Sequence, residues 1–132
     1  MLKTSAVTTI LPVSDLERAS DFYENILGLL PKGHTPEGNL LYSFGEGFFI
    51  ALSKHPDDVF TEYTALSFEV EDLDEAIAEL KEKGISFIKY PVPDAKSKGI
   101  VYEMQGEKAA WFKDTEGNVI SIHQLVMSSL ET

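Results

Sequence analysis

The chain has 132 residues, of which 43% are hydrophobic and 11% aromatic, so it can bury the core of one folded domain, and disorder is excluded. Its 11 basic and 22 acidic residues give a formal charge of −11, which excludes nucleic acid as a partner because such a chain repels phosphate backbones. The absence of cysteine excludes disulfides and thiolate metal sites and fits a cytoplasmic location. No apolar run is long enough for a membrane span, so we expect no membrane partner.

The first predicted elements are a strand and an amphipathic helix. "SAVTTILPV", residues 5–13, is short and β-branched, which favours a strand. Ser14 and Glu17 then have the spacing of a capping box, although Asp15 could cap the helix instead. Gly28 is the predicted end of the helix. The apolar residues that recur at helical spacing are Leu16, Ala19, Phe22, Tyr23, Ile26 and Leu27.

Further strands are predicted after this helix. "LLYSF", residues 40–44, and "FFIALS", residues 48–53, are joined by the turn-like "GEG". A shorter and weaker strand is expected near Leu29 and Leu30. Residues 54–62 are polar and contain a proline, which predicts a linker.

The second half repeats the plan of the first, because "VEDLDEA" at 70–76 closely matches "VSDLERA" at 13–19. "TALSFEV" predicts a strand, Asp72 and Glu75 repeat the capping-box spacing, and Gly84 closes the second helix. Later strands are expected at "ISFIKY", "AAWFKD" and "NVISIHQ", the last two joined by a tight turn at "DTEGN". "GIVYEM" is either another strand or an ordered part of the long segment before it.

These elements predict two βαβββ modules, at about 5–53 and 63–126, within a single domain of residues 1–132. Most strands follow one another through hairpins rather than helical crossovers. We therefore expect an α+β protein whose sheet is mixed and mostly antiparallel.

Two stretches carry a resemblance to a known family. "VTTILPVSDLERASDFYENILGL" together with "AAWFKDTEGNVISIHQ" resembles the vicinal oxygen chelate superfamily, which includes glyoxalases, bleomycin resistance proteins, extradiol dioxygenases and fosfomycin-modifying enzymes. The resemblance extends over about residues 6–125 and is specific for the fold rather than for a function. It implies that two modules curl their sheets into a cup with the helices outside, and that the protein is a homodimer.

The resemblance also implies where metal ligands would stand. The family places a histidine or carboxylate at positions that correspond here to Thr8, Ala51, Ala65 and Ser121. A protein-held divalent ion needs three or four oxygen or nitrogen donors, and hydroxyls and methyl groups do not replace imidazole and carboxylate. We therefore expect neither a metal nor another cofactor.

Strand alternation separates two faces in the predicted sheet. The apolar face should pack under the helices, and the mixed, small and polar face is typical of a ligand-binding concavity. The predicted ligand-side residues are Phe49, Ala51 and Ser53, then Ala65, Ser67 and Glu69, then Val119, Ser121 and His123. The predicted apolar residues are Phe48, Ile50 and Leu52, then Leu66, Phe68 and Val70, then Ile120 and Ile122.

Among the three histidines, His123 is the candidate for chemistry, whereas His34 and His55 are expected to be exposed. His123 could act as an acid or base and could pair with Glu69 or remain inert at a rim or interface. Tyr42, Phe44, Phe49, Tyr102 and Trp111 should border the cup, and the sequence does not decide which of them face inward. The predicted pocket consists of Thr8, Phe49, Ala51, Ala65, Ser67, Glu69, Trp111, Ser121 and His123.

Two classes of function follow from these residues and the resemblance. The first is a metal-independent binding protein of the glyoxalase/bleomycin-resistance type for a small organic ligand, with cations favoured by the negative charge. The alternative is a glyoxalase-like lyase or isomerase, or a dioxygenase, with a displaced metal or with His123 as acid–base. A weaker third option is a partner domain without a ligand.

Overall fold

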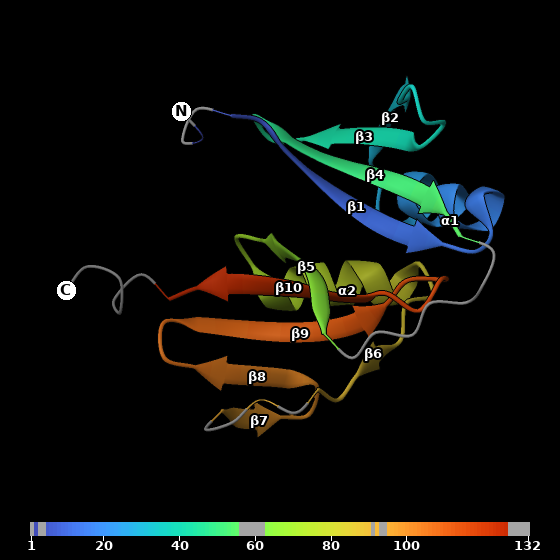
Figure 1. The fold of residues 1–132 in the computed structure, drawn as a ribbon. Coiled ribbons are helices and arrows are strands. Elements are labelled where there is room, and N and C mark those ends of the chain that lie inside the picture. Colours follow the sequence, from blue (N-terminus) through green and yellow to red (C-terminus); the bar gives the residue numbers. More distant parts are fainter. Residues whose placement is uncertain (1, 3–4, 56–62, 91, 93–94, 127–132) are drawn as a thin grey trace. The chain divides into compact units, whose positions relative to one another are not determined.

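The computed structural model describes residues 2, 5–55, 63–90, 92 and 95–126. The chain divides into two compact units (Figure 1). The first comprises Met1–Phe60 and Asp114–Asn118, and the second comprises Thr61–Lys113 and Val119–Thr132. Most of the predicted linker, residues 56–62, and the tail 127–132 lie outside the described residues. Within the described part of the chain, no helix is long and apolar enough to cross a membrane.

The first unit contains one sheet of four strands in the order β1-β4-β3-β2. β1 and β4 pair in parallel, whereas the other neighbours pair antiparallel. The parallel pair requires a crossover, and a helix follows β1 as the sequence predicts. The strands are β1 (Val7–Val13), β2 (Leu30–His34), β3 (Leu40–Phe44) and β4 (Phe48–Lys54).

The first helix has two parts, α1 (Leu16–Asp21) and the π-helical turn η2 (Phe22–Ile26). Asp15, rather than Ser14, caps α1, because its side chain accepts a hydrogen bond from Arg18 N at 3.0 Å. The π-helical turn was not predicted; it shows in the hydrogen bond from Leu27 N to the carbonyl of Phe22 at 3.0 Å.

The second unit contains a sheet in the order β5-β10-β9-β8-β7, with β6 paired to β9. β5 and β10 are parallel, and their connection includes α2 (Leu73–Glu82), which contacts β9 and β10 on one face of the sheet (Figure 1). Ile120 is fully buried and Ile122 is 3% exposed, in agreement with the predicted apolar face, whereas Phe48 of β4, predicted for the same face, is 52% exposed. The strands are β5 (Thr64–Glu69), β6 (Phe87–Ile88), β7 (Lys96–Lys98), β8 (Val101–Met104), β9 (Glu107–Lys113) and β10 (Val119–Leu125).

The fold is therefore α+β with two mostly antiparallel sheets, as predicted. Two details of the strands differ from the expectation: "ISFIKY" contributes only the two-residue strand β6, and β7 arises in a segment for which no separate strand was expected. Of the two alternatives left open for "GIVYEM", the structure shows the strand, β8.

The turn between β9 and β10 belongs to the first unit and is built from buried polar residues. Asp114 accepts hydrogen bonds from the Tyr23 hydroxyl at 2.6 Å and from the backbone N of Glu116 and Asn118 at 2.8 Å each. Asn118 Nδ2 donates to the carbonyl of Pro12 at 3.0 Å. The "DTEGN" turn is therefore part of the first unit's core as well as a hairpin connection.

Candidate functional site

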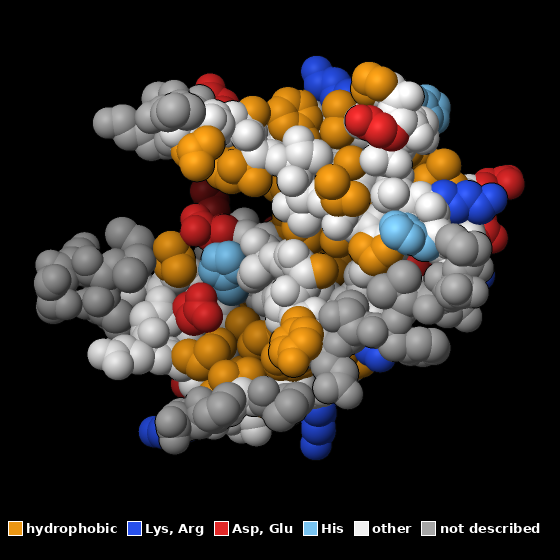
Figure 2. Space-filling view, viewed as in Figure 1, with side chains coloured by type: hydrophobic (Ala, Val, Ile, Leu, Met, Phe, Trp, Pro, Cys, Tyr) orange, Lys and Arg blue, Asp and Glu red, His pale blue; other side chains and the backbone are white. Residues whose placement is uncertain are grey.

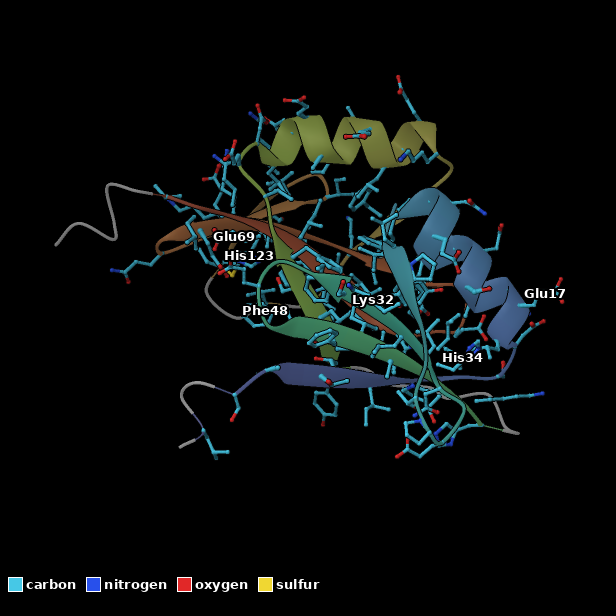
Figure 3. The ribbon with its side chains drawn as sticks, turned by 90° about the horizontal axis from the view of Figure 1, so that it is seen from above. Glu17, Lys32, His34, Phe48, Glu69 and His123 are labelled. Carbon is cyan, nitrogen blue, oxygen red and sulfur yellow. The ribbon has the colours of Figure 1, made fainter. Side chains whose placement is uncertain are left out.

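The predicted ligand-side residues of the second unit form a hydrogen-bonded group, which we call the polar cluster: Ser67, Glu69, Ser121 and His123. Ser67 Oγ lies 2.6 Å from Nδ1 of His123 and 3.0 Å from Oγ of Ser121. His123 Nε2 lies 3.9 Å from Oε1 of Glu69. Figure 3 labels Glu69 and His123, whose side chains lie next to each other.

The pairing of two strands creates this cluster. β5 and β10 run parallel with Ser67 opposite Ser121 and Glu69 opposite His123. Residues that are paired across strands point to the same face, so all four side chains share one side of the sheet. The sequence placed them on one face by alternation, and the register now shows which of them are neighbours. We call this the site face.

The polar cluster is open to solvent at one end and closed at the other. Ser121 is 3% exposed, whereas Ser67 is exposed. The side chains of His123 and Glu69 are 18% and 64% exposed. The imidazole is thus held within the protein while the carboxylate and the Ser67 hydroxyl remain accessible.

An aromatic cluster, consisting of Tyr90, Tyr102 and Trp111, adjoins the polar cluster. The rings of Tyr90 and Trp111 are stacked, with centroids 4.9 Å apart and planes at 10°, and Tyr102 meets Trp111 edge-on at 5.4 Å. Ser121 pairs with Trp111 across β9 and β10, which joins the two clusters. Figure 2 shows a histidine and acidic side chains over β10, with hydrophobic side chains gathered over β8 and β9 beside them.

Tyr90 and Thr64 complete this region, and the sequence analysis did not single them out. Tyr90 N donates to the Tyr102 hydroxyl at 3.0 Å, and Trp111 Nε1 donates to Thr64 Oγ1 at 3.0 Å. A register shift in the β5–β10 pair places Thr64 opposite Val119, while Ala65 is half-buried. No motif marks Tyr90, because only the return of the chain across β9 brings it to Trp111.

The remaining predicted pocket residues belong to the first unit. Thr8 pairs with Phe49, and Ala51 follows two residues along β4 on the same face. Thr8 is exposed, Phe49 is half-buried and Ala51 is 2% exposed. His34 and His55 are exposed, as predicted.

For two of the aromatics whose direction the sequence left open, Tyr42 and Phe44, the register places the side chains on the helix side of their sheet. Tyr42 pairs with Ile50 and is fully buried on the helix side of its sheet, and Phe44 pairs with Phe48 on that same side. The Tyr42 hydroxyl donates to Glu24 Oε2 at 2.7 Å. Burial and then this carboxylate raise the pKa of Tyr42, so the phenol stays protonated and acts as a structural donor.

Surface hollows of about 500, 420 and 370 Å³ lie along α1, at the β8–β9 turn and beside α2. None of these three is lined by a predicted pocket residue. The hollow along α1 is bordered mainly by charged helix side chains, which is typical of a solvated helix surface rather than of a binding site. The site face therefore remains the candidate site on the strength of its side chains.

The residues that the structure describes do not fit a protein-held metal ion. Among the described residues, no group of three or more histidine and acidic side chains stands close enough to hold one. On the site face, Glu69 and His123 offer two donors, fewer than a divalent ion requires. Ser121, at a position that the resemblance assigns to a carboxylate, is buried and hydrogen-bonded to Ser67.

Comparisons with known proteins agree with this fold. The family described as the Glyoxalase/Bleomycin resistance protein/Dioxygenase superfamily matches residues 5–122. A superfamily member from Sphaerobacter thermophilus is 24% identical, with a TM-score of 0.71 over 94% of this chain and 99% of that one. An antibiotic binding protein from Streptomyces sp. CB03234 is 23% identical, with a TM-score of 0.63 over 93% and 98%. A fosfomycin resistance protein from Listeria monocytogenes is 14% identical, with a TM-score of 0.69 over 96% and 97%. The chain belongs to the glyoxalase/bleomycin resistance protein/dioxygenase superfamily.

Proposed function

We propose that this chain is a metal-independent binding protein for a small organic molecule and that the site face of the second unit contacts the ligand. The observation that carries the proposal is the burial and hydrogen bonding of Ser121. Where the family resemblance implies a metal-binding carboxylate, a buried hydroxyl is hydrogen-bonded to another hydroxyl. Such a position suits recognition of an organic ligand and not coordination of an ion.

The chemistry of the site face indicates the kind of ligand. In the aromatic cluster Tyr102 and Trp111 are 9% and 6% exposed, so the half-buried Tyr90 offers its accessible apolar surface. The polar cluster provides hydroxyls, an imidazole and a carboxylate. Glu69 is largely exposed and the chain carries a formal charge of −11, so a cationic group on the ligand would be attracted. The antibiotic-binding and fosfomycin-resistance neighbours support a small organic ligand.

The proposal includes Thr8, Phe49 and Ala51 as further ligand-side residues, on the first unit. It also includes a homodimer in the cytoplasm, as expected from the resemblance and from the cysteine-free composition.

The proposal is tested by native mass spectrometry of gently purified protein, which should reveal a co-purified small molecule. Trp111 is the single tryptophan, so its fluorescence reports directly on the site face during titration with the released compound. We expect His123→Ala to weaken binding at least about tenfold, because it removes a polar contact of the site. Ser20→Ala on α1, away from every predicted ligand-side residue, is the control. Trp111→Phe lacks the fluorophore, so its affinity is measured by native mass spectrometry. Unchanged affinity in both His123→Ala and Trp111→Phe would contradict the choice of this face.

A second candidate function is a lyase or isomerase in which His123 moves a proton. It is favoured by the placement of the imidazole, which contacts Ser67 through Nδ1 and faces Glu69 through Nε2. If this candidate is right, the co-purified molecule should change its mass or absorbance over time with the parent protein and stay unchanged with His123→Ala. A binding protein leaves the molecule intact in both.

A further inference from the structure

The hydrogen bond between Ser67 and His123 has a geometry that ligand binding alone does not require. A serine hydroxyl 2.6 Å from an imidazole nitrogen is within the distance at which a general base activates a nucleophile. We propose that Ser67 is a nucleophile activated by His123 and that the polar cluster accepts acyl groups from activated esters. This inference goes beyond the proposed binding function and can hold or fail independently of it.

The neighbours of His123 favour one arrangement of its protons. When the ring hydrogen is on Nε2, Nδ1 accepts from the Ser67 hydroxyl and the N–H lies on the side of Glu69, at 3.9 Å between Nε2 and Oε1. As Nδ1 takes the proton of Ser67, the imidazole becomes positively charged, and the Glu69 carboxylate stabilises that charge. Serine, histidine and glutamate thus stand in the order of a nucleophile, a base and a group that supports the base.

Ser121 adds a second hydroxyl to the cluster. A hydroxyl has one hydrogen, so when Ser67 donates to His123, Ser121 is free to donate to Ser67 Oγ across the 3.0 Å that separates them. Ser121 is 3% exposed and its position is fixed by the β5–β10 register. Its hydrogen bond therefore holds the Ser67 hydroxyl in position beside the imidazole.

The cluster is accessible and has an apolar neighbour. Ser67 is exposed, so an ester carbonyl can approach its Oγ. Trp111 pairs with Ser121 across the sheet but is only 6% exposed, so the half-buried Tyr90 stacked on it is the ring of the aromatic cluster that an ester could contact.

The proposed reaction is balanced without a cofactor. Ser67 Oγ attacks the ester carbonyl, its proton passes to Nδ1 of His123, and a new C–O bond to the serine forms. The bond to the leaving alcohol or phenol breaks, and that group takes the proton from His123. Water then attacks the acyl-serine, again losing a proton to His123, and releases the carboxylic acid while Ser67 regains its proton.

A cysteine substitution tests the activation directly, because the chain contains no cysteine and Ser67→Cys introduces its single thiol. The rate of alkylation by iodoacetamide measures the thiolate fraction. At neutral pH we expect Ser67→Cys to react at least about tenfold faster than Ser5→Cys, a control at a serine that is likewise exposed, with a midpoint below the ordinary thiol pKa of about 8.5. Adding His123→Gln should restore the ordinary rate and midpoint. Equal rates with and without His123 would overturn the proposal.

The unaltered protein provides the second test. After incubation with p-nitrophenyl acetate, mass spectrometry of peptides should locate an acetyl group on Ser67. Trapping should be lost in Ser67→Ala and reduced about tenfold in Ser121→Ala, which removes a hydrogen bond to the nucleophile. Acetyl groups found only on lysines or the amino terminus would overturn the proposal. Circular dichroism of each variant identifies any that fail to fold, and the result with the unaltered protein then decides. Loss of ligand binding with Ser67 still reactive would contradict only the proposed binding function.

Discussion

At the scale of single residues, Glu116 makes long-range hydrogen bonds within the first unit that no sequence motif indicates. Its side chain has no exposed surface and accepts hydrogen bonds from Asp15 N at 2.9 Å, from Ser14 N at 3.0 Å and from Arg18 Nε at 2.8 Å. The sequence predicts a turn at "DTEGN" but not this contact, because it joins residues about a hundred positions apart. Long-range hydrogen bonds of this kind leave no periodicity to detect.

Glu116→Gln should destabilise the protein by about 2 kcal/mol, because the amide keeps the shape but loses the charge that Arg18 and two backbone donors require. The free energy of unfolding in urea measures the effect. Glu79→Gln, on the exposed side of α2, is the matched control and should change it by less than about 0.5 kcal/mol. Equal losses of unfolding free energy in both variants would show that the Glu116 contacts do not stabilise the protein.

The same carboxylate predicts how stability depends on pH. Burial by itself raises the pKa of Glu116, but hydrogen bonds from Arg18, Asp15, Thr115 and Ser14 outweigh it and lower the pKa to about 2. A depressed carboxyl pKa contributes stability above the unfolded value of about 4.5, and that contribution is lost as the pH falls from about 4.5 to about 2. Unfolding free energies measured across this window should therefore fall less steeply in Glu116→Gln than in the parent.

At the scale of elements, the two helix starts are the features that the sequence predicted best. Each helix is capped by an aspartate whose side chain accepts from the backbone N three residues later, at 3.0 Å for both Asp15 and Asp72. The duplicated heptapeptides therefore mark two helix N-termini. The capping residue of the first helix had to be chosen between Ser14 and Asp15, since spacing alone permits both.

Asp72→Ala should lower the unfolding free energy by about 1 kcal/mol, because the amide of Glu75 loses its acceptor. Asp72→Asn should retain most of that stability, since asparagine is an equally good cap. Asp74→Ala, which removes an exposed acid from the same first turn without removing a cap, serves as the control. Urea titration of the three variants distinguishes the loss of a cap from the loss of a charge near the helix dipole.

For the strands, the sequence predicted which side chains share a face but not which of them are in contact. Alternation predicted that Ser67, Ser121 and His123 share a face, and the structure confirms it. It could not predict that Ser67 contacts His123, because the register of β5 on β10 depends on packing rather than on either strand alone. The π-helical turn and β7 were missed for a related reason: both are local adjustments within segments whose residue patterns are compatible with more than one conformation.

At the scale of the whole molecule, the two copies of the module differ, because only the second copy has the hydrogen-bonded serines, histidine and glutamate on its parallel strand pair. β1 with β4 and β5 with β10 are equivalent parallel pairs. Where the second unit pairs Ser67 with Ser121 and Glu69 with His123, the first pairs Ile10 with Ala51 and Pro12 with Ser53. A site built on the first module alone would have neither a base nor an acid at these positions. The sequence could assign the fold from the repeat, but function depends on how the copies diverged.

This divergence also predicts how the protein responds to metals. We expect Zn²⁺, Ni²⁺, Mn²⁺ and Fe²⁺ to leave the melting temperature unchanged in physiological salt, and a chelator to leave it unchanged as well. An ion held at a hundredfold excess over its Kd would add about 2.7 kcal/mol to the unfolding free energy, which a thermal shift detects easily. The charge of −11 attracts divalent ions weakly at any surface, so the titration is repeated at higher salt, where diffuse attraction is screened and coordination survives. A salt-resistant shift with one ion per chain in elemental analysis would show that ligands other than Thr8, Ala51, Ala65 and Ser121 assemble a metal site, and the proposed metal-independent function would then be wrong.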